Sequence, residues 1–200
     1  MSFLTNDTRR RIGIIGMCAM IIGLAWVLQL AVVSQIRLGI VQASLPLTIT
    51  IVWGITFGSP VAAPTLDELR VSDFRAVLVR QMLSGSVSGA LIGACFAGLY
   101  SSVLPVYPVC YPIIGYIAGY FCLRNFNQSL ILCIPLVLIF TFLGEGITAL
   151  HLAILGRPEV FEKFMEVVMS EGVLNALIAP FIFVPMRGWC EFAKYREMMG

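Results

Sequence analysis

The chain has 200 residues, of which 59% are hydrophobic and 12% are charged, and its formal net charge is +2. Soluble domains are about 45–50% apolar and about 25% charged, so this composition excludes a soluble enzyme, a secreted disulfide scaffold and a disordered tail. One histidine and so small a net charge exclude a basic nucleic-acid surface. The alternating segments of a transmembrane barrel are absent from the sequence. We therefore predict an all-α integral membrane protein.

The first apolar run, 12–33, follows three arginines and has features of a secretory signal. Its 22 residues exceed the roughly 7–15 residues of a signal's apolar region, and no small-x-small cleavage site follows it. We interpret it as an uncleaved first span.

Breaks in apolarity divide the chain into six predicted spans, because a helix needs roughly 20 apolar residues to cross a bilayer. A charged loop at 60–80 follows the second span, and a charged segment at 157–171 precedes the sixth. We expect one six-helix transmembrane domain over 1–200. The predicted spans are 12–33, 38–57, 81–104, 109–123, 129–150 and 172–186.

Arginine and lysine placement predicts the orientation, since basic residues concentrate in cytoplasmic loops. With the N-terminus inside, only three of the 13 basic residues, Arg37, Arg157 and Lys163, fall outside. We therefore predict cytoplasmic termini, a cytoplasmic 60–80 loop and an extracytoplasmic 157–171 segment. The predicted cytoplasmic residues are Arg9, Arg10, Arg11, Arg70, Arg75, Arg80, Arg124, Arg187, Lys194 and Arg196.

Small residues recur at four-residue intervals in the third span, at Gly85, Gly89 and Gly93. Such rows let two helix backbones approach closely, which is how helices associate in lipid. The pairs Ala19/Gly23 and Gly115/Gly119 repeat this spacing. These faces either pack within the chain or receive a partner helix.

The segment 157–171 has the pattern of an amphipathic helix. Its apolar residues fall at i, i+3, i+4 and i+7, and Pro158 suits a first helical turn. Such a helix either lies on lipid or receives an extracytoplasmic domain of a partner. The apolar residues are Phe161, Phe164, Met165 and Val168.

Glu145 is the one ionisable residue well inside a predicted span, and such a carboxylate is functional by default or serves to lock two helices together. Antiparallel spans place it within roughly 5 Å in depth of Asn175, so we expect the two side chains to share a hydrogen bond.

No enzymatic or metal motif accompanies these residues. The serines at 84–88 and His151 fall at opposite ends of their predicted spans, too far apart for a nucleophile and its base. One histidine and scattered cysteines make no metal site. We expect no enzymatic activity, cofactor or metal.

The C-terminal half resembles a known family. Its clearest signal is the Leu-Asn-Ala-Leu-x-Ala-Pro stretch at 174–180, supported by 144–150 and 116–120. This pattern is similar to the rod shape-determining protein MreD family, its cyanobacterial branch in particular, over roughly residues 85–190. The resemblance implies a non-catalytic, six-helix protein of the bacterial inner membrane whose fold is similar to the substrate-binding subunits of energy-coupling-factor transporters. The long 60–80 loop departs from the short turn that is usual in the family.

The resemblance also implies partners: an MreC-like bitopic protein and the peptidoglycan elongation machinery of MreB, RodA and a class B penicillin-binding protein. The alternative is a small-molecule binding subunit of a vitamin or metal transporter, which needs an outward polar pocket built from residues such as Thr141. The candidates for helix packing or partner contact are Gly85, Gly89, Gly93, Glu145, Asn175 and Pro180.

Overall fold

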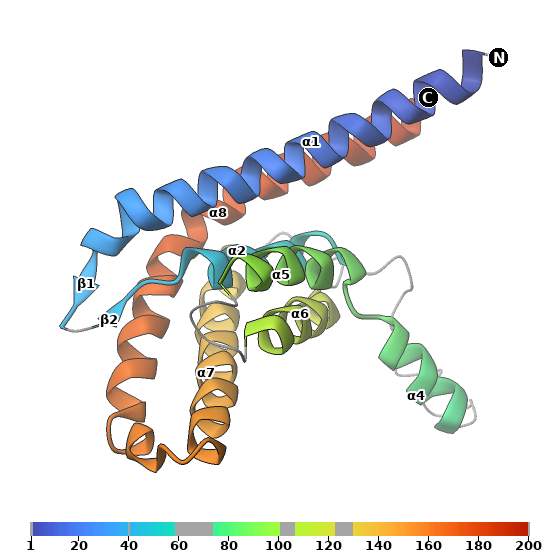
Figure 1. The fold of residues 1–200 in the computed structure, drawn as a ribbon. Coiled ribbons are helices and arrows are strands. Elements are labelled where there is room, and N and C mark those ends of the chain that lie inside the picture. Colours follow the sequence, from blue (N-terminus) through green and yellow to red (C-terminus); the bar gives the residue numbers. More distant parts are fainter. Residues whose placement is uncertain (1, 40, 59–73, 101–106, 123–129, 200) are drawn as a thin grey trace.

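The structure, a computed structural model, describes residues 2–39, 41–58, 74–100, 107–122 and 130–199. This part of the chain is almost entirely helical (Figure 1). Three short 3-10 turns, Val33–Gln35, Gly119–Phe121 and Pro158–Glu162, accompany the helices, and a small hairpin pairs β1 (Arg37–Leu38) with β2 (Val41–Gln42). The α-helices are α1 (Ser2–Ala31), α2 (Leu45–Thr56), α4 (Phe74–Leu83), α5 (Val87–Tyr100), α6 (Tyr107–Ala118), α7 (Leu130–Ile154) and α8 (Phe164–Met199).

Within the described ranges, three helical stretches are long and apolar enough to cross a membrane: Cys18–Gln35, Leu130–Ile154 and Phe164–Phe192. This agrees with the prediction of an all-α membrane protein. The second, third and fourth predicted spans correspond instead to apolar helices of 10–17 residues, shorter than the roughly 20 residues of a full span. By length, the structure supports three of the six predicted spans.

The second predicted span, 38–57, is wrong in its first third. Residues 37–38 and 41–42 pair as the β1–β2 hairpin, and Gly39 after β1 has φ 65°. The helix begins only at Leu45, with Pro46 in its first turn, where the missing amide hydrogen breaks no helical bond. The apolar character of 38–44 reflects burial of Val41 and Ala43 rather than helix.

The third predicted span, 81–104, contains a break. α4 ends at Leu83, and α5 begins only at Val87; residues 101–104 lie outside the described part. Ser86 causes the separation, because its hydroxyl accepts a hydrogen bond from the Gly89 amide at 3.0 Å, as a helix N-cap does. The same hydroxyl donates to the Phe57 carbonyl at 2.6 Å and so fixes the start of α5 against the end of α2.

The amphipathic helix expected over 157–171 is also divided. Pro158–Glu162 is a 3-10 turn, and α8 begins at Phe164 and continues without interruption through the sixth predicted span to Met199. The spacing of the apolar residues could not reveal this turn, because the same helical spacing continues across it.

α8 changes direction along its length (Figure 1). Its first part packs on α7, and its last part runs toward the end of the molecule where α1 begins. Pro180 and Pro185 lie inside the helix, and each removes a helical hydrogen bond, which accounts for a bend. Beyond them Trp189 packs edge-on against Trp53 and Phe57, with ring centroids 5.5 and 5.4 Å apart.

α2 is the centre of the fold. All 12 of its residues are buried, and α5, α6, α7 and α8 surround it (Figure 1). Large apolar side chains fill the space around it, among them Phe96, Ile114 and Phe183. A helix that is apolar all round is expected at such a central place.

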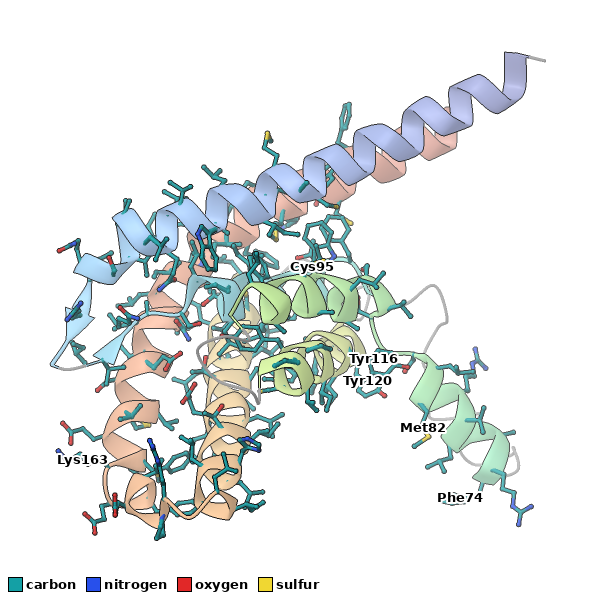
Figure 2. All side chains as sticks on the ribbon, viewed as in Figure 1. Phe74, Met82, Cys95, Tyr116, Tyr120 and Lys163 are labelled. Carbon is teal, nitrogen blue, oxygen red and sulfur yellow. The ribbon has the colours of Figure 1, made fainter. Side chains whose placement is uncertain are left out.

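α4 extends away from the other helices (Figure 1). Phe74, at its outer end, is 76% exposed, whereas its last turn is held by Tyr116 and Tyr120, whose hydroxyls both donate to the Met82 carbonyl (Figure 2). Of the predicted charged loop 60–80, residues 60–73 lie outside the described part, and 74–80 belong to α4.

The first residues of α1 and the last of α8 lie at the same end of the molecule (Figure 1), and the charge distribution predicts that this end is cytoplasmic. We expect a cysteine introduced at exposed Glu162 to react with a membrane-impermeant maleimide added outside intact cells. The unsubstituted protein reports the background from its own six cysteines. Labelling only after the cells are opened would contradict the predicted orientation.

Candidate functional site: a polar cavity between α1, α2, α7 and α8

A cavity of about 460 Å³ lies where α1 ends and α2 and α8 begin. Its wall combines polar side chains, two of them carboxylates, with aliphatic and aromatic ones. The polar lining residues are Gln29, Gln42, Ser44, Tyr111, Glu145, Thr148 and Glu171, and the apolar ones are Ala43, Pro46, Ala149, Leu152, Val160, Phe164 and Val167.

Asn175 holds the base of this region together. Its side chain is fully buried, and its Oδ1 accepts a hydrogen bond from the Ser44 amide at 2.7 Å. Its Nδ2 donates to Thr141 Oγ1 at 3.2 Å and to Glu171 Oε1 at 3.4 Å. One amide side chain thus connects the start of α2 with α7 and α8, and both of its amide hydrogens have acceptors.

The hydrogen bond expected between Glu145 and Asn175 is not formed. Asn175 meets Thr141, four residues before Glu145, so the two helices are offset by one turn from the expected register. Within the described part of the chain, Glu145 makes no hydrogen bond; it lines the cavity instead. The estimate of membrane depth from the sequence placed Asn175 near the correct part of α7. It was not precise enough to distinguish Glu145 from Thr141, one helical turn earlier.

Gln29 was missed at the sequence level. It lies near the end of α1, is 6% exposed, and donates from Nε2 to the Ala43 carbonyl at 3.0 Å. Its Oε1 accepts from the Leu45 amide at 2.8 Å, which satisfies one of the free amides at the start of α2. A lone glutamine inside an otherwise apolar span was the available signal, because a buried amide needs partners.

Glu171 was placed on an exposed segment, yet it is only 9% exposed and lines the cavity with Glu145. The two carboxylates are near enough for their charges to interact. Asn175 donates to Oε1 of Glu171, while Oε2 has no hydrogen-bond partner among the described residues. No lysine, arginine or histidine lines this cavity in the described chain.

The small residues of α5 and α6 face one another. A Cβ added at Gly89 would lie less than 3.0 Å from the carbonyl of Gly115, and one at Gly93 would meet the backbone of Tyr111. Gly85 lies under the ring of Tyr116. These glycines therefore permit close packing within the chain.

The small residues of α1 have no such neighbours. A Cβ at Gly16 or Gly23 would meet nothing within 4 Å, and Ala19 between them is exposed. Of the rows with this spacing, the one on α1 faces outward from the described structure.

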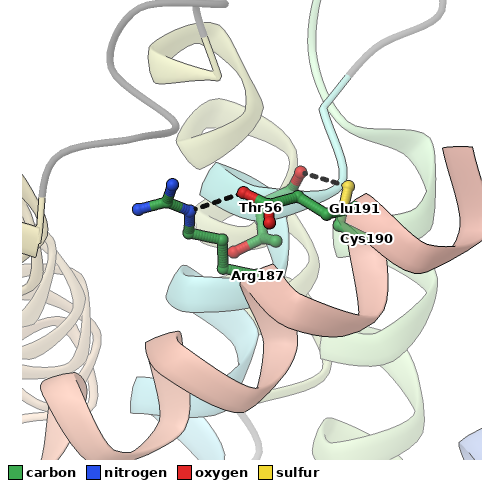
Figure 3. A network of polar contacts seen from close by, with 4 residues as sticks. All are labelled: Thr56, Arg187, Cys190 and Glu191. Carbon is green, nitrogen blue, oxygen red and sulfur yellow. Dashed lines mark hydrogen bonds and ion pairs between the residues drawn. The ribbon is translucent and has the colours of Figure 1, made fainter. Parts of the chain in front are cut away.

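Two further features lie toward the other end of the bundle. The Thr56 carbonyl, at the end of α2, accepts a hydrogen bond from the Cys190 thiol, and Arg187 pairs with Glu191 at 2.8 Å on the surface nearby (Figure 3). The Cys122 thiol donates to the same carbonyl. An apolar groove of about 310 Å³ separates α1 from α8 and is lined from Leu24 and Leu28 on one side to Phe181 on the other.

The described residues contain no group of three or more His, Cys, Asp or Glu side chains that is placed to hold a metal ion. Comparisons with protein-family models, curated proteins and solved structures find no match to this chain.

Proposed function

We propose that the chain is a non-catalytic scaffold subunit of the bacterial cell-shape machinery, similar to MreD, which holds the transmembrane helix of an MreC-like bitopic protein. The observation that carries this proposal is the open row on α1 formed by Ala19 and Gly23, four residues apart, with Gly16 three residues before Ala19 on the same face. The resemblance at 174–180 suggests the family, and the row of small residues on α1 offers a surface on which the partner helix can pack.

A helix gains nothing from the hydrophobic effect when it moves from lipid onto another helix, so close backbone packing has to hold the pair. Small residues four apart provide that closeness. In α5 and α6 they are already used within the chain, as at Gly89 and Gly115. On α1, where the row is open, a second helix can approach without displacing any neighbour of Gly23.

The resemblance extends the proposal to further partners and to a location. MreB, RodA and a class B penicillin-binding protein would join the same complex, which supports peptidoglycan synthesis during elongation. The complex would lie in the bacterial inner membrane, with both termini of this chain in the cytoplasm.

The substitution Gly23→Leu tests the proposed docking face. The leucine side chain would hold two helix backbones apart, so we expect co-purification of a co-expressed MreC homologue to fall at least several-fold. The amount of this chain should stay unchanged, because Gly23 has open space around it.

Gly98→Leu is the matched control, since Gly98 also has open space around it but lies on α5. Equal retention of the partner by both variants would contradict docking on α1. Equal loss would show that any added bulk disturbs the complex, and would also contradict it.

The polar cavity favours a second candidate function, the small-molecule binding subunit of a transporter. Such a subunit needs a polar pocket, and Glu145, Thr148 and Glu171 line one. Affinity purification from the native organism separates the two candidates: a bitopic coiled-coil partner supports the scaffold, and transporter ATPases support the binding subunit.

A further inference from the structure

The cavity between α1, α2, α7 and α8 has the size of a ligand site. Its volume of about 460 Å³ falls within the roughly 300–1,000 Å³ of pockets that hold small molecules, and it far exceeds the space that a single ion needs. Its lining combines polar side chains with apolar ones, among them Val160, Phe164 and Val167. A molecule with a polar head and a small carbon body matches this mixed lining.

The charged residues in the cavity wall indicate which charge the polar group of a ligand would carry. Glu145 and Glu171 both line the cavity, and no basic side chain of the described chain lines it with them. Glu171 is 9% exposed, and its Oε2 has no hydrogen-bond partner among the described residues. Two carboxylates held near one another in a poorly solvated place repel, and a cation between them relieves that cost for both groups at once.

We propose that this cavity binds a small organic amine through its ammonium group. The ammonium would donate hydrogen bonds to Glu145 and to the free oxygen of Glu171, which are the strong, charge-assisted kind. The Tyr111 ring also lines the cavity, and aromatic rings attract cations. The site lies apart from the open face of α1; it adds a ligand to the scaffold and names the ligand class of the second candidate function.

The test uses a matched pair of probes on the purified full chain in detergent, without any partner. We expect 10 mM n-butylammonium to raise the melting temperature by about 2–5 °C, because binding to the folded state alone stabilises it. Butyrate at the same concentration has the same length but the opposite charge, and we expect no shift. The proposal would be overturned if both probes shifted the melting temperature equally, or if neither probe shifted it.

The variants assign the effect to the two carboxylates. Glu145→Gln and Glu171→Gln, made singly, should each reduce the shift by more than half, since each removes one anionic partner. Glu166→Gln, at an exposed position five residues before Glu171, should keep it in full. If either glutamine variant fails to fold, the other decides. A full shift in a folded Glu145→Gln or Glu171→Gln protein would contradict the assignment.

An ammonium group can come from a free amine or from a phosphatidylethanolamine headgroup. Repeating the titration in nanodiscs of phosphatidylethanolamine or of phosphatidylglycerol separates these sources. Loss of the butylammonium shift only in phosphatidylethanolamine would identify the headgroup as the occupant, whereas a shift in both would identify a free amine. Because no partner is present in the assay, its failure would leave helix docking on α1 unaffected.

Discussion

Gly89→Leu is expected to abolish the accumulation of folded protein. A Cβ at this position would already lie less than 3.0 Å from the backbone of Gly115, and a backbone cannot move aside as the end of a flexible side chain can. The whole leucine side chain would force α5 and α6 apart along their shared face. Overpacking costs typically about 1–3 kcal/mol where side chains can adjust, so we expect more than that here. Fluorescence-detected size exclusion of detergent extracts measures the outcome.

Gly98→Leu makes the same substitution on the same helix. Nothing lies within 4 Å of a Cβ added at Gly98, so we expect a normal monodisperse peak. A normal peak for Gly89→Leu as well would mean that α5 and α6 do not meet through this row. The row would then be free for lipid or for a partner.

Asn175→Leu is expected to lower the melting temperature by more than any other single polar-to-apolar change in the described core. The substitution leaves the Ser44 amide without its acceptor and Glu171 without its donor. Each buried polar group left without a partner costs roughly 1–3 kcal/mol. For a chain of this size, a loss of 1 kcal/mol corresponds to about 2–4 °C, so we expect a drop on the order of 5–15 °C.

Gln35→Leu is the control, because it also replaces a polar amide by leucine but at an exposed position. Its melting temperature should change by no more than a degree or two. A similarly small change for Asn175→Leu would show that water satisfies Ser44 and Glu171, and that the amide network does not hold α2 in place.

The long apolar helices were the part of the fold that the sequence could predict. The span expected at 129–150 is α7, Leu130–Ile154, and the span expected at 12–33 lies within α1 and the turn after it. Length and apolarity sufficed there because both properties extend over many residues. The start of α5 could not be placed in this way, since it depends on a hydroxyl of Ser86 that meets a residue 29 positions earlier.

The candidate site was predicted in part. Glu145, Thr141 and Asn175 were identified because a polar residue in an apolar span is conspicuous. Their partners were not, because pairing depends on helix register, and one turn of about 5.4 Å separates a correct neighbour from a wrong one. Glu171 was assigned to an exposed segment because the sequence does not show that α8 runs through this position with Glu171 on its inward face.

The unequal lengths of the helices have a consequence for the surrounding lipid. α5 and α6 have 14 and 12 residues, about 18–21 Å at 1.5 Å per residue, whereas α7 has 25 residues, about 38 Å. The hydrocarbon core of a bilayer is about 30 Å thick. Leu91 on α5 and Ile139 on α7 are both exposed, so the short and the long helices both present apolar side chains outward. If α5 and α6 cross the bilayer with only their described lengths, as the proposed membrane subunit would require, local thinning of the bilayer beside them would relieve the mismatch.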